Sequence, residues 1–207
     1  MARYGKQHKE ATRRRIIEAA GRRLKRDGID GSGISALMAD AGLTNGAFYA
    51  HFASKDDLVT TAISDQLGQQ RERYRAEIAG RAELEQLVRE YLSVEHRDNP
   101  ADGCPSAALL DEIGRCSDVT KQIYTDGMLD IADHIASVVA PKDRPAARAQ
   151  ALSLFALLIG TLQLSRALAD PQVADAVLEQ GIQNALVILG PRRVADRRRT
   201  TGHTPSS

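Results

Sequence analysis

Apolar residues recur every three or four positions along almost the whole chain, and this spacing constrains the fold more than any other sequence feature. Such a period matches one face of an α-helix, whereas a half-buried strand would alternate apolar and polar residues. Convincing alternation of that kind is scarce. A chain of 207 residues has room for one large or two small domains. We therefore expect an all-α protein of about nine helices, with three short helices at the N-terminus and six in a larger body.

Glycine, proline and capping residues predict where these helices begin and end. Gly28 and Gly42 are expected to stop the first two helices, because glycine ends a helix without backbone strain. Ser54 followed by Asp57 is a variant of the capping box, which starts a helix. The spacing predicts further helices over about residues 55–78, 82–96, 105–115, 118–139, 146–169 and 171–189.

The net charge of +1 hides an uneven distribution. Residues 1–60 carry a net charge of +4, residues 61–190 carry −7 and residues 191–207 carry +4. A basic end attached to an acidic body indicates a module that faces a polyanion. The alternative, a charged face that is simply solvated, stays open on charge alone.

Composition argues against several other classes of protein. Two cysteines are too few for a disulfide scaffold and fit a reducing cytoplasm, where we expect the protein to act. No apolar h-region follows the basic start, and the most apolar segment, residues 151–164, is interrupted by polar residues, so neither a secretory signal nor a membrane span is expected. No metal-ligand spacing or phosphate-binding loop is present, so we expect no metal, no cofactor and no enzyme. Ser106, Asp130 and His134 hold the atoms of a nucleophile and base, but no known motif frames the serine.

A helix-turn-helix is the most informative local pattern. Two short apolar segments meet at Gly42, and the second begins with the polar residues Thr44, Asn45 and Gly46. In such a motif the N-terminal end of the second helix enters the major groove of DNA. An asparagine there can bond an adenine edge, and a glycine lets the backbone approach closely. This pattern predicts a DNA-contacting surface.

The segment AGLTNGAFYAHFASKDDL, residues 41–58, resembles the signature of the TetR/AcrR family of one-component transcriptional regulators. The likeness covers roughly residues 10–60. It implies that Tyr49, His51 and Lys55 contact phosphates. It also implies that Thr44, Asn45 and Gly46 lie near base edges, and that Arg14 reaches the DNA backbone or a neighbouring groove. The sequence departs from the family pattern at Ala47, where a hydroxyl is common, and at Gly33, which leaves Ser32 or Ser35 to cap the second helix.

The resemblance also implies a two-fold dimer in which the last two helices of each subunit form a four-helix bundle. The helix over residues 146–169 is apolar on most sides, as expected for a helix buried on most sides. An intramolecular core alone is the alternative. The expected interface residues are Leu154, Leu158, Leu162, Val177, Ile182 and Leu186.

The middle helices are expected to enclose a site for a small-molecule effector that is itself largely apolar. Most of the candidate residues must belong to the core, and Tyr74, Tyr91 and His134 could orient a ligand. The candidates are Leu67, Tyr74, Tyr91, Leu110, Ile113, Met128, Ile131 and His134.

Taken together, these patterns predict a helix-turn-helix DNA-binding domain over residues 1–54, a helical ligand-binding and dimerisation domain over 55–190, and a basic disordered tail over 191–207. The expected function is a repressor that binds a pseudo-palindromic double-stranded operator as a dimer and is released by an effector. Two alternatives stay open. The first is a thiol sensor acting through Cys104, which precedes a helix whose N-terminus can stabilise a thiolate. The second is a DNA-binding protein without an effector.

Overall fold

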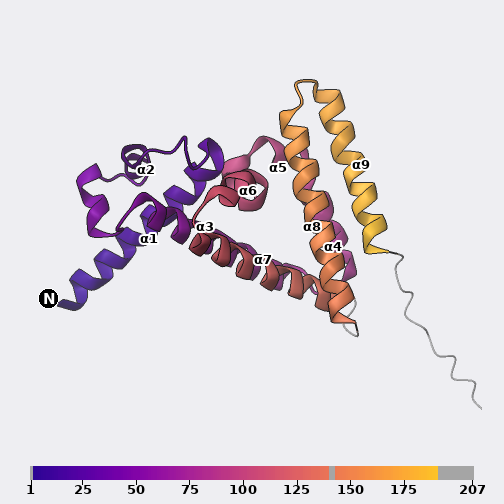
Figure 1. Ribbon diagram of the computed structural model, residues 1–207, viewed down its shortest axis with the longest axis horizontal. Coiled ribbons are helices and arrows are strands. Elements are labelled where there is room, and N and C mark those ends of the chain that lie inside the picture. The colour runs from indigo at the N-terminus through magenta and orange to yellow at the C-terminus, as the bar shows by residue number, and fades with distance from the viewer. Residues whose placement is uncertain (1, 140–142, 191–207) are drawn as a thin grey trace, which may run out of the picture.

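The computed structural model describes residues 2–139 and 143–190, and within those residues every regular element is helical. Nine α-helices and two 3-10 helices appear in that part of the chain, which confirms the all-α prediction (Figure 1). The elements are α1 (Ala2–Asp27), α2 (Ile34–Asp40), η1 (Asn45–Ala50), α3 (Lys55–Glu77), α4 (Arg81–Tyr91), α5 (Val94–Asp98), η2 (Pro100–Asp102), α6 (Pro105–Arg115), α7 (Asp118–Val139), α8 (Arg144–Ala167) and α9 (Pro171–Leu189). The tail expected over residues 191–207 lies outside the described residues.

The predicted helix ends are confirmed where a local signal set them. Gly28 and Gly42 have φ angles of +78° and +65°, which side-chain-bearing residues rarely adopt. The Ser54 hydroxyl accepts a hydrogen bond from the Asp57 amide at 3.1 Å, and the Asp57 carboxylate accepts one from the Ala53 amide at 3.0 Å. Both contacts satisfy amides at the start of α3 that no helical carbonyl can reach.

Two local predictions were wrong. The segment expected over residues 82–96 is two helices, because Ser93 accepts a hydrogen bond from the His96 amide and so caps a separate helix α5. The predicted second helix of the helix-turn-helix is present as η1 and has 3-10 geometry. Gly33 occupies the N-cap of α2 without any side-chain cap, and the Ser32 hydroxyl donates to the Gly28 carbonyl instead.

The N-terminal unit has a small core of its own beneath the helix-turn-helix. Its centre is Phe48, which is fully buried and packs against Phe52 with ring centroids 5.8 Å apart. Apolar residues of α1, α2 and α3 complete this core: Ile16, Leu24, Leu37, Met38 and Leu58. The short helices are therefore held by tertiary packing rather than by their own length.

The N-terminal unit and the α8–α9 pair of the body lie at opposite ends of the molecule (Figure 1). Helices α3 and α7 pack along each other between these two ends, and α8 and α9 lie side by side at the far end. Because α3 begins directly after the helix-turn-helix and continues into the body, it connects the two parts through one rigid element.

Most of the expected interface residues are core residues of a single chain. Leu154, Leu158, Leu162 and Ile182 are between 0% and 8% exposed, so they have no surface left to offer a partner. Val177 and Leu186 are half-buried. The prediction was wrong for the four buried residues because an apolar stripe does not say which neighbour covers it.

The exposed side of α8 is nevertheless apolar. Leu152, Ala156, Gly160 and Leu164 follow one another at four-residue intervals and are all exposed. By length and composition the segment Pro145–Ala167 is also apolar enough to cross a membrane, contrary to the sequence-based expectation, and core helices of soluble proteins meet the same criterion. This exposed row is the feature that a partner chain would cover.

Candidate nucleic-acid interface and effector pocket

The start of η1 presents a polar, accessible surface. Thr44, Asn45 and Gly46 are all exposed, and a side chain at Gly46 would meet no other atom within 4 Å. Tyr49 is 71% exposed although its ring touches the buried Phe48 edge-on, with centroids 5.1 Å apart. An aromatic side chain fixed at its base and open to solvent at its tip is well placed to contact a partner.

Helix α1 adds positive charge beside this surface. The Arg13 guanidinium lies over the Phe52 ring, 4.7 Å from its centroid. Burial, followed by the nearby charges of Lys9 and Arg13, lowers the pKa of His51 below its ordinary value. His51 is therefore mainly uncharged at neutral pH and offers an N–H group rather than a full charge. Sequence reasoning missed Lys9 and Arg13, although their four-residue spacing places them on one face of a helix.

Two of the expected DNA contacts already have partners within the chain. The Arg14 side chain is 80% exposed and pairs with Glu18 at 2.8 Å. The Lys55 ammonium group is half-buried and donates to the Ile29 carbonyl at 2.5 Å, which ties the start of α3 to the loop after α1. Lys55 thus has a structural role in addition to any contact that its remaining N–H groups could make.

The match to known families begins in this segment. A family model described as bacterial regulatory proteins of the tetR family matches residues 16–62. The HTH-type transcriptional regulator AcrR from Shigella flexneri is 38% identical over 58 residues, which are 28% of this chain and 27% of the relative. Residues 16–62 are therefore similar to the N-terminal part of tetR-family regulatory proteins. The alignment spans only about a quarter of that relative, so this comparison does not cover most of the chain.

Solved structures of TetR-type regulators share the fold over most of the chain. The reduced form of NemR from Escherichia coli has a TM-score of 0.70 at 17% identity, and the match covers 84% of this chain and 95% of NemR. A TetR regulator from Chloroflexus aurantiacus gives 0.67 at 22% identity, with coverages of 87% and 95%. FadR from Bacillus subtilis, solved with stearoyl-CoA, gives 0.55 at 16% identity, with coverages of 81% and 96%. At these identities the likeness concerns the fold alone.

A pocket of about 1120 Å³ opens between α1, α3, α4 and the segment from Ser93 to Pro105. Charged and amide side chains make up most of its lining, together with the two tyrosines Tyr74 and Tyr91. The lining residues are Glu18, Arg22, Lys25, Gln66, Gln69, Gln70, Arg73, Tyr74, Gln86, Arg89, Glu90, Tyr91, Ser93, Glu95, His96, Asn99, Ala101, Asp102, Gly103, Cys104 and Pro105. This polar lining differs from the expectation of a largely apolar effector.

Of the eight residues expected to touch an effector, the pocket brings together only Tyr74 and Tyr91. Leu67, Ile113 and Ile131 are buried in the core, and Leu110 is 36% exposed on the outer surface. The Met128 sulfur accepts a contact from the Ser106 hydroxyl, and the His134 ring donates to the Tyr74 carbonyl at 3.1 Å. These six residues do not line the pocket, because their side chains pack in the core, contact other residues or lie on the outer surface.

The closed end of the pocket gathers several buried polar groups. The Tyr74 hydroxyl accepts a hydrogen bond from the Gln70 amide at 2.8 Å, and the same amide lies 3.4 Å from the Cys104 sulfur. The Tyr91 hydroxyl is buried beside the Cys104 thiol and bonds to no oxygen or nitrogen atom of the described residues. Burial and then the neighbouring Cys104 raise the pKa values of both tyrosines, so both hydroxyls stay protonated and can donate.

His96 fixes the loop at this end of the pocket. Its Nδ1 donates to the Tyr91 carbonyl at 2.8 Å, and its Nε2 accepts from the Cys104 amide at 3.0 Å. Burial lowers the pKa of His96, consistent with a neutral ring that uses both nitrogens structurally. A side chain at Gly103 would come within 2.5 Å of the ring, so this close approach requires glycine.

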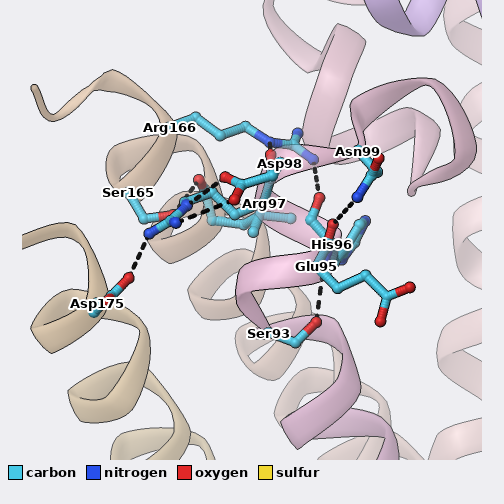
Figure 2. Close-up of polar contacts among 10 residues, drawn as sticks. Ser93, Glu95, His96, Arg97, Asp98, Asn99, Ser165, Arg166 and Asp175 are labelled. Carbon is cyan, nitrogen blue, oxygen red and sulfur yellow. Dashed lines mark hydrogen bonds and ion pairs between the residues drawn. The ribbon is translucent and has the colours of Figure 1, made fainter. Parts of the chain in front are cut away.

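Arg166 of α8 holds the same segment from the other side (Figure 2). Its guanidinium donates to the carbonyls of His96 at 2.7 Å, Arg97 at 3.0 Å and Ala107 at 3.1 Å. Arg97 in turn pairs with Asp175 of α9 at 2.6 Å. One side chain therefore joins α8 to α5 and α6, and sets the position of the pocket wall.

Lys25 and Glu112 each connect the body to the N-terminal unit through hydrogen bonds. The Lys25 ammonium group of α1 donates to the Gly103 carbonyl at 2.9 Å. The Glu112 carboxylate of α6 accepts hydrogen bonds from the amides of Ile29 at 2.8 Å and Asp30 at 3.1 Å. Gly103 precedes α6 and Glu112 lies in its last turn. A shift of α6 therefore changes these contacts to α1 and to the loop that leads into the helix-turn-helix.

The side chains considered for nucleophilic catalysis have other partners. The Ser106 hydroxyl accepts from Tyr124 at 2.9 Å, Asp130 pairs with Arg71 at 3.0 Å, and His134 contacts the Tyr74 backbone. The structure does not assemble these three residues into a catalytic arrangement.

Proposed function

We propose that the protein is a one-component transcriptional repressor that binds a pseudo-palindromic operator as a dimer and is released by a small-molecule effector. The observation that carries this proposal is the exposed surface of η1, where Tyr49 stands beside Thr44, Asn45 and Gly46 on a TetR-type helix-turn-helix. Lys9, Arg13 and Arg14 of α1 supply positive charge for phosphates. Double-stranded DNA in the cytoplasm is the expected partner.

Release by an effector is supported by the position of the pocket. Its wall includes Gly103, which the α1 residue Lys25 contacts, so a ligand that moves this wall changes the constraint on α1. A ligand that prefers a conformation with the two DNA-binding units wrongly spaced must weaken operator binding by the same coupling energy. FadR, solved with stearoyl-CoA, is one regulator of this fold that binds a ligand.

The alternatives have less support. Cys104 lines the pocket but is 7% exposed, which limits the access of an oxidant or electrophile. A DNA-binding protein without an effector would leave a pocket of about 1120 Å³ without a use. Catalysis would need side chains brought together, which Ser106, Asp130 and His134 are not.

Operator binding tests the proposal. The full-length protein is titrated against the DNA upstream of its own gene and against a scrambled duplex, at one stated salt concentration. We expect a preference of about a thousandfold or more for the specific site. Equal, weak binding to both duplexes would favour the effector-independent alternative, and no binding even at low salt would contradict the proposal.

We expect dimerisation through the exposed apolar face of α8 and α9. Its members are Leu152, Ala156, Gly160 and Leu164 on α8, and Val173 and Val187 on α9. A side chain at Gly160 would meet no atom of its own chain, so a partner helix has room to approach there. Leu164→Asp should therefore give a 22.5 kDa monomer where the unaltered protein elutes as a dimer, because a buried unpaired carboxylate disfavours association.

The measurement is size-exclusion chromatography with light scattering. Val119→Asp is the matched control, since Val119 is 66% exposed on α7, outside the proposed face. A Leu164→Asp protein that remains dimeric would place the interface elsewhere.

A further inference from the structure

Lys25 is the starting point, because it is the only charged side chain that is buried among the described residues. It is 7% exposed, and its single hydrogen bond goes to a backbone carbonyl, that of Gly103. Asp102 and Arg22 act on Lys25 with opposite signs, and they pair with each other at 2.8 Å at the exposed rim. A buried ammonium group without a hydrogen-bonded carboxylate is costly for the fold unless something else compensates it.

Tyr91 is the second independent observation. Its side chain is 4% exposed and lines the same pocket, and its buried hydroxyl has the weakly accepting Cys104 thiol beside it but bonds to no oxygen or nitrogen atom of the described residues. Both side chains lie beside Cys104, because the Lys25 ammonium group donates to the carbonyl of the preceding residue, Gly103, and the Tyr91 hydroxyl lies next to the thiol. The buried part of the pocket therefore offers an O–H donor that has no oxygen or nitrogen acceptor, and the spare N–H groups of a cation.

The carboxylates of the lining do not offset these donors. Glu18, Glu90, Glu95 and Asp102 are all exposed at the rim of the pocket, where water screens their charge. The cationic rim residues Arg22, Arg73 and Arg89 are exposed as well. His96 faces the pocket as a neutral ring with both nitrogens occupied. The excess of donors thus lies at the buried end, beside Lys25.

We propose that the closed end of this pocket binds the carboxylate group of an organic acid, with Lys25 as its charge partner and Tyr91 as a hydrogen-bond donor. The amide side chains of Gln66, Gln69 and Gln70 also line the pocket and would face the rest of the bound organic acid. This inference rests on the proposed function and names the chemical class of its effector. Burial lowers the pKa of Lys25 to about 8, so the amine is mostly charged at neutral pH and becomes easier to charge when an anion binds.

The position of Lys25 gives the site a direct route to DNA binding. Lys25 belongs to α1, which packs against the helix-turn-helix, whereas Tyr91 belongs to α4 of the body. A carboxylate held by both side chains would bridge the two parts of the protein. Its binding energy is therefore coupled to the orientation of α1, and through α1 to operator affinity.

The test compares three probes with the same ring and different charge: benzoate, benzamide and benzylamine. Each is titrated at millimolar concentrations into the full-length protein at pH 7 and constant ionic strength, and the shift in Tm gives its affinity. We expect benzoate alone to raise Tm. Lys25→Met should weaken benzoate binding about tenfold or more, and Tyr91→Phe about three- to tenfold, because each removes a donor to a charged group.

Lys121→Met is the matched control, because Lys121 is an exposed lysine on α7. It should bind benzoate as the unaltered protein does. Lys25→Met is expected to fold, because the buried charge that it removes offsets the donor lost by the Gly103 carbonyl, and its Tm without benzoate is the reference for its own titration. The proposal is overturned if benzoate leaves Tm unchanged, if benzamide matches benzoate, or if Lys25→Met binds benzoate as tightly as Lys121→Met.

Operator binding measured on the same preparations separates this inference from the proposed function. If the protein binds its operator specifically but benzoate fails these tests, only the carboxylate site is wrong. If it does not bind operator DNA, the proposed function fails whatever benzoate does. If both stand, benzoate should change operator affinity in the unaltered protein and leave it unchanged in Lys25→Met.

Discussion

Replacing Phe48 with alanine should lower the free energy of unfolding of the N-terminal unit by about 3–5 kcal/mol. Phe48 is fully buried and contacts both Phe52 and Tyr49. The unit is small, so few other residues can close over the cavity left by the ring. Urea denaturation followed by circular dichroism measures the loss, and operator binding should disappear with the fold of the helix-turn-helix.

Tyr49→Ala provides the matched comparison at the adjacent position. Tyr49 is 71% exposed, so its removal should change the free energy of unfolding by about 0.5 kcal/mol or less. Operator affinity should nevertheless fall about tenfold or more, because the phosphate contact that we propose for Tyr49 would be lost. An altered protein that binds the operator normally would exclude Tyr49 from the DNA interface. A large loss of stability would instead show that its ring supports the core.

Arg166→Met should destabilise the body by about 2–4 kcal/mol, the second largest effect that we expect. The substitution removes the guanidinium donors from the carbonyls of His96 and Arg97 in α5 and takes a second donor from the Ala107 carbonyl, which keeps its helical hydrogen bond. Part-buried carbonyls that lose a charged donor cost more than the hydrogen bonds themselves contribute. Thermal denaturation measures the effect, and hydrogen exchange should increase first in α5 and at the start of α6.

Arg115→Met is the control for charge removal alone. Arg115 is an exposed residue that pairs with Asp111 one turn earlier on α6, and an exposed pair of this kind contributes about 1 kcal/mol or less. Equal stability losses in the Arg166→Met and Arg115→Met proteins would contradict the role that we assign to Arg166.

Most helices and several of their ends could be predicted from the sequence, because the residues that determine them are close together along the chain. The left-handed turns at Gly28 and Gly42 and the cap formed by Ser54 and Asp57 all involve residues at most four positions apart. The same holds for the helix-turn-helix, whose aromatic and polar positions fall within residues 41–58. A short-range pattern carries enough information to specify a short-range structure.

The pocket and the outer face of α8 were decided by tertiary structure alone. An apolar stripe shows that a helix is covered, but Leu154 and Leu158 turned out to be covered by their own chain while Leu152 and Leu164 are not. Lys25 and Gly103, which meet at the pocket, are 78 positions apart. Nothing in the basic start of the chain distinguishes Lys25 from the arginines around it. Only the packing of α1 against the body removes this one cation from water, because burial depends on neighbours that the local sequence does not contain.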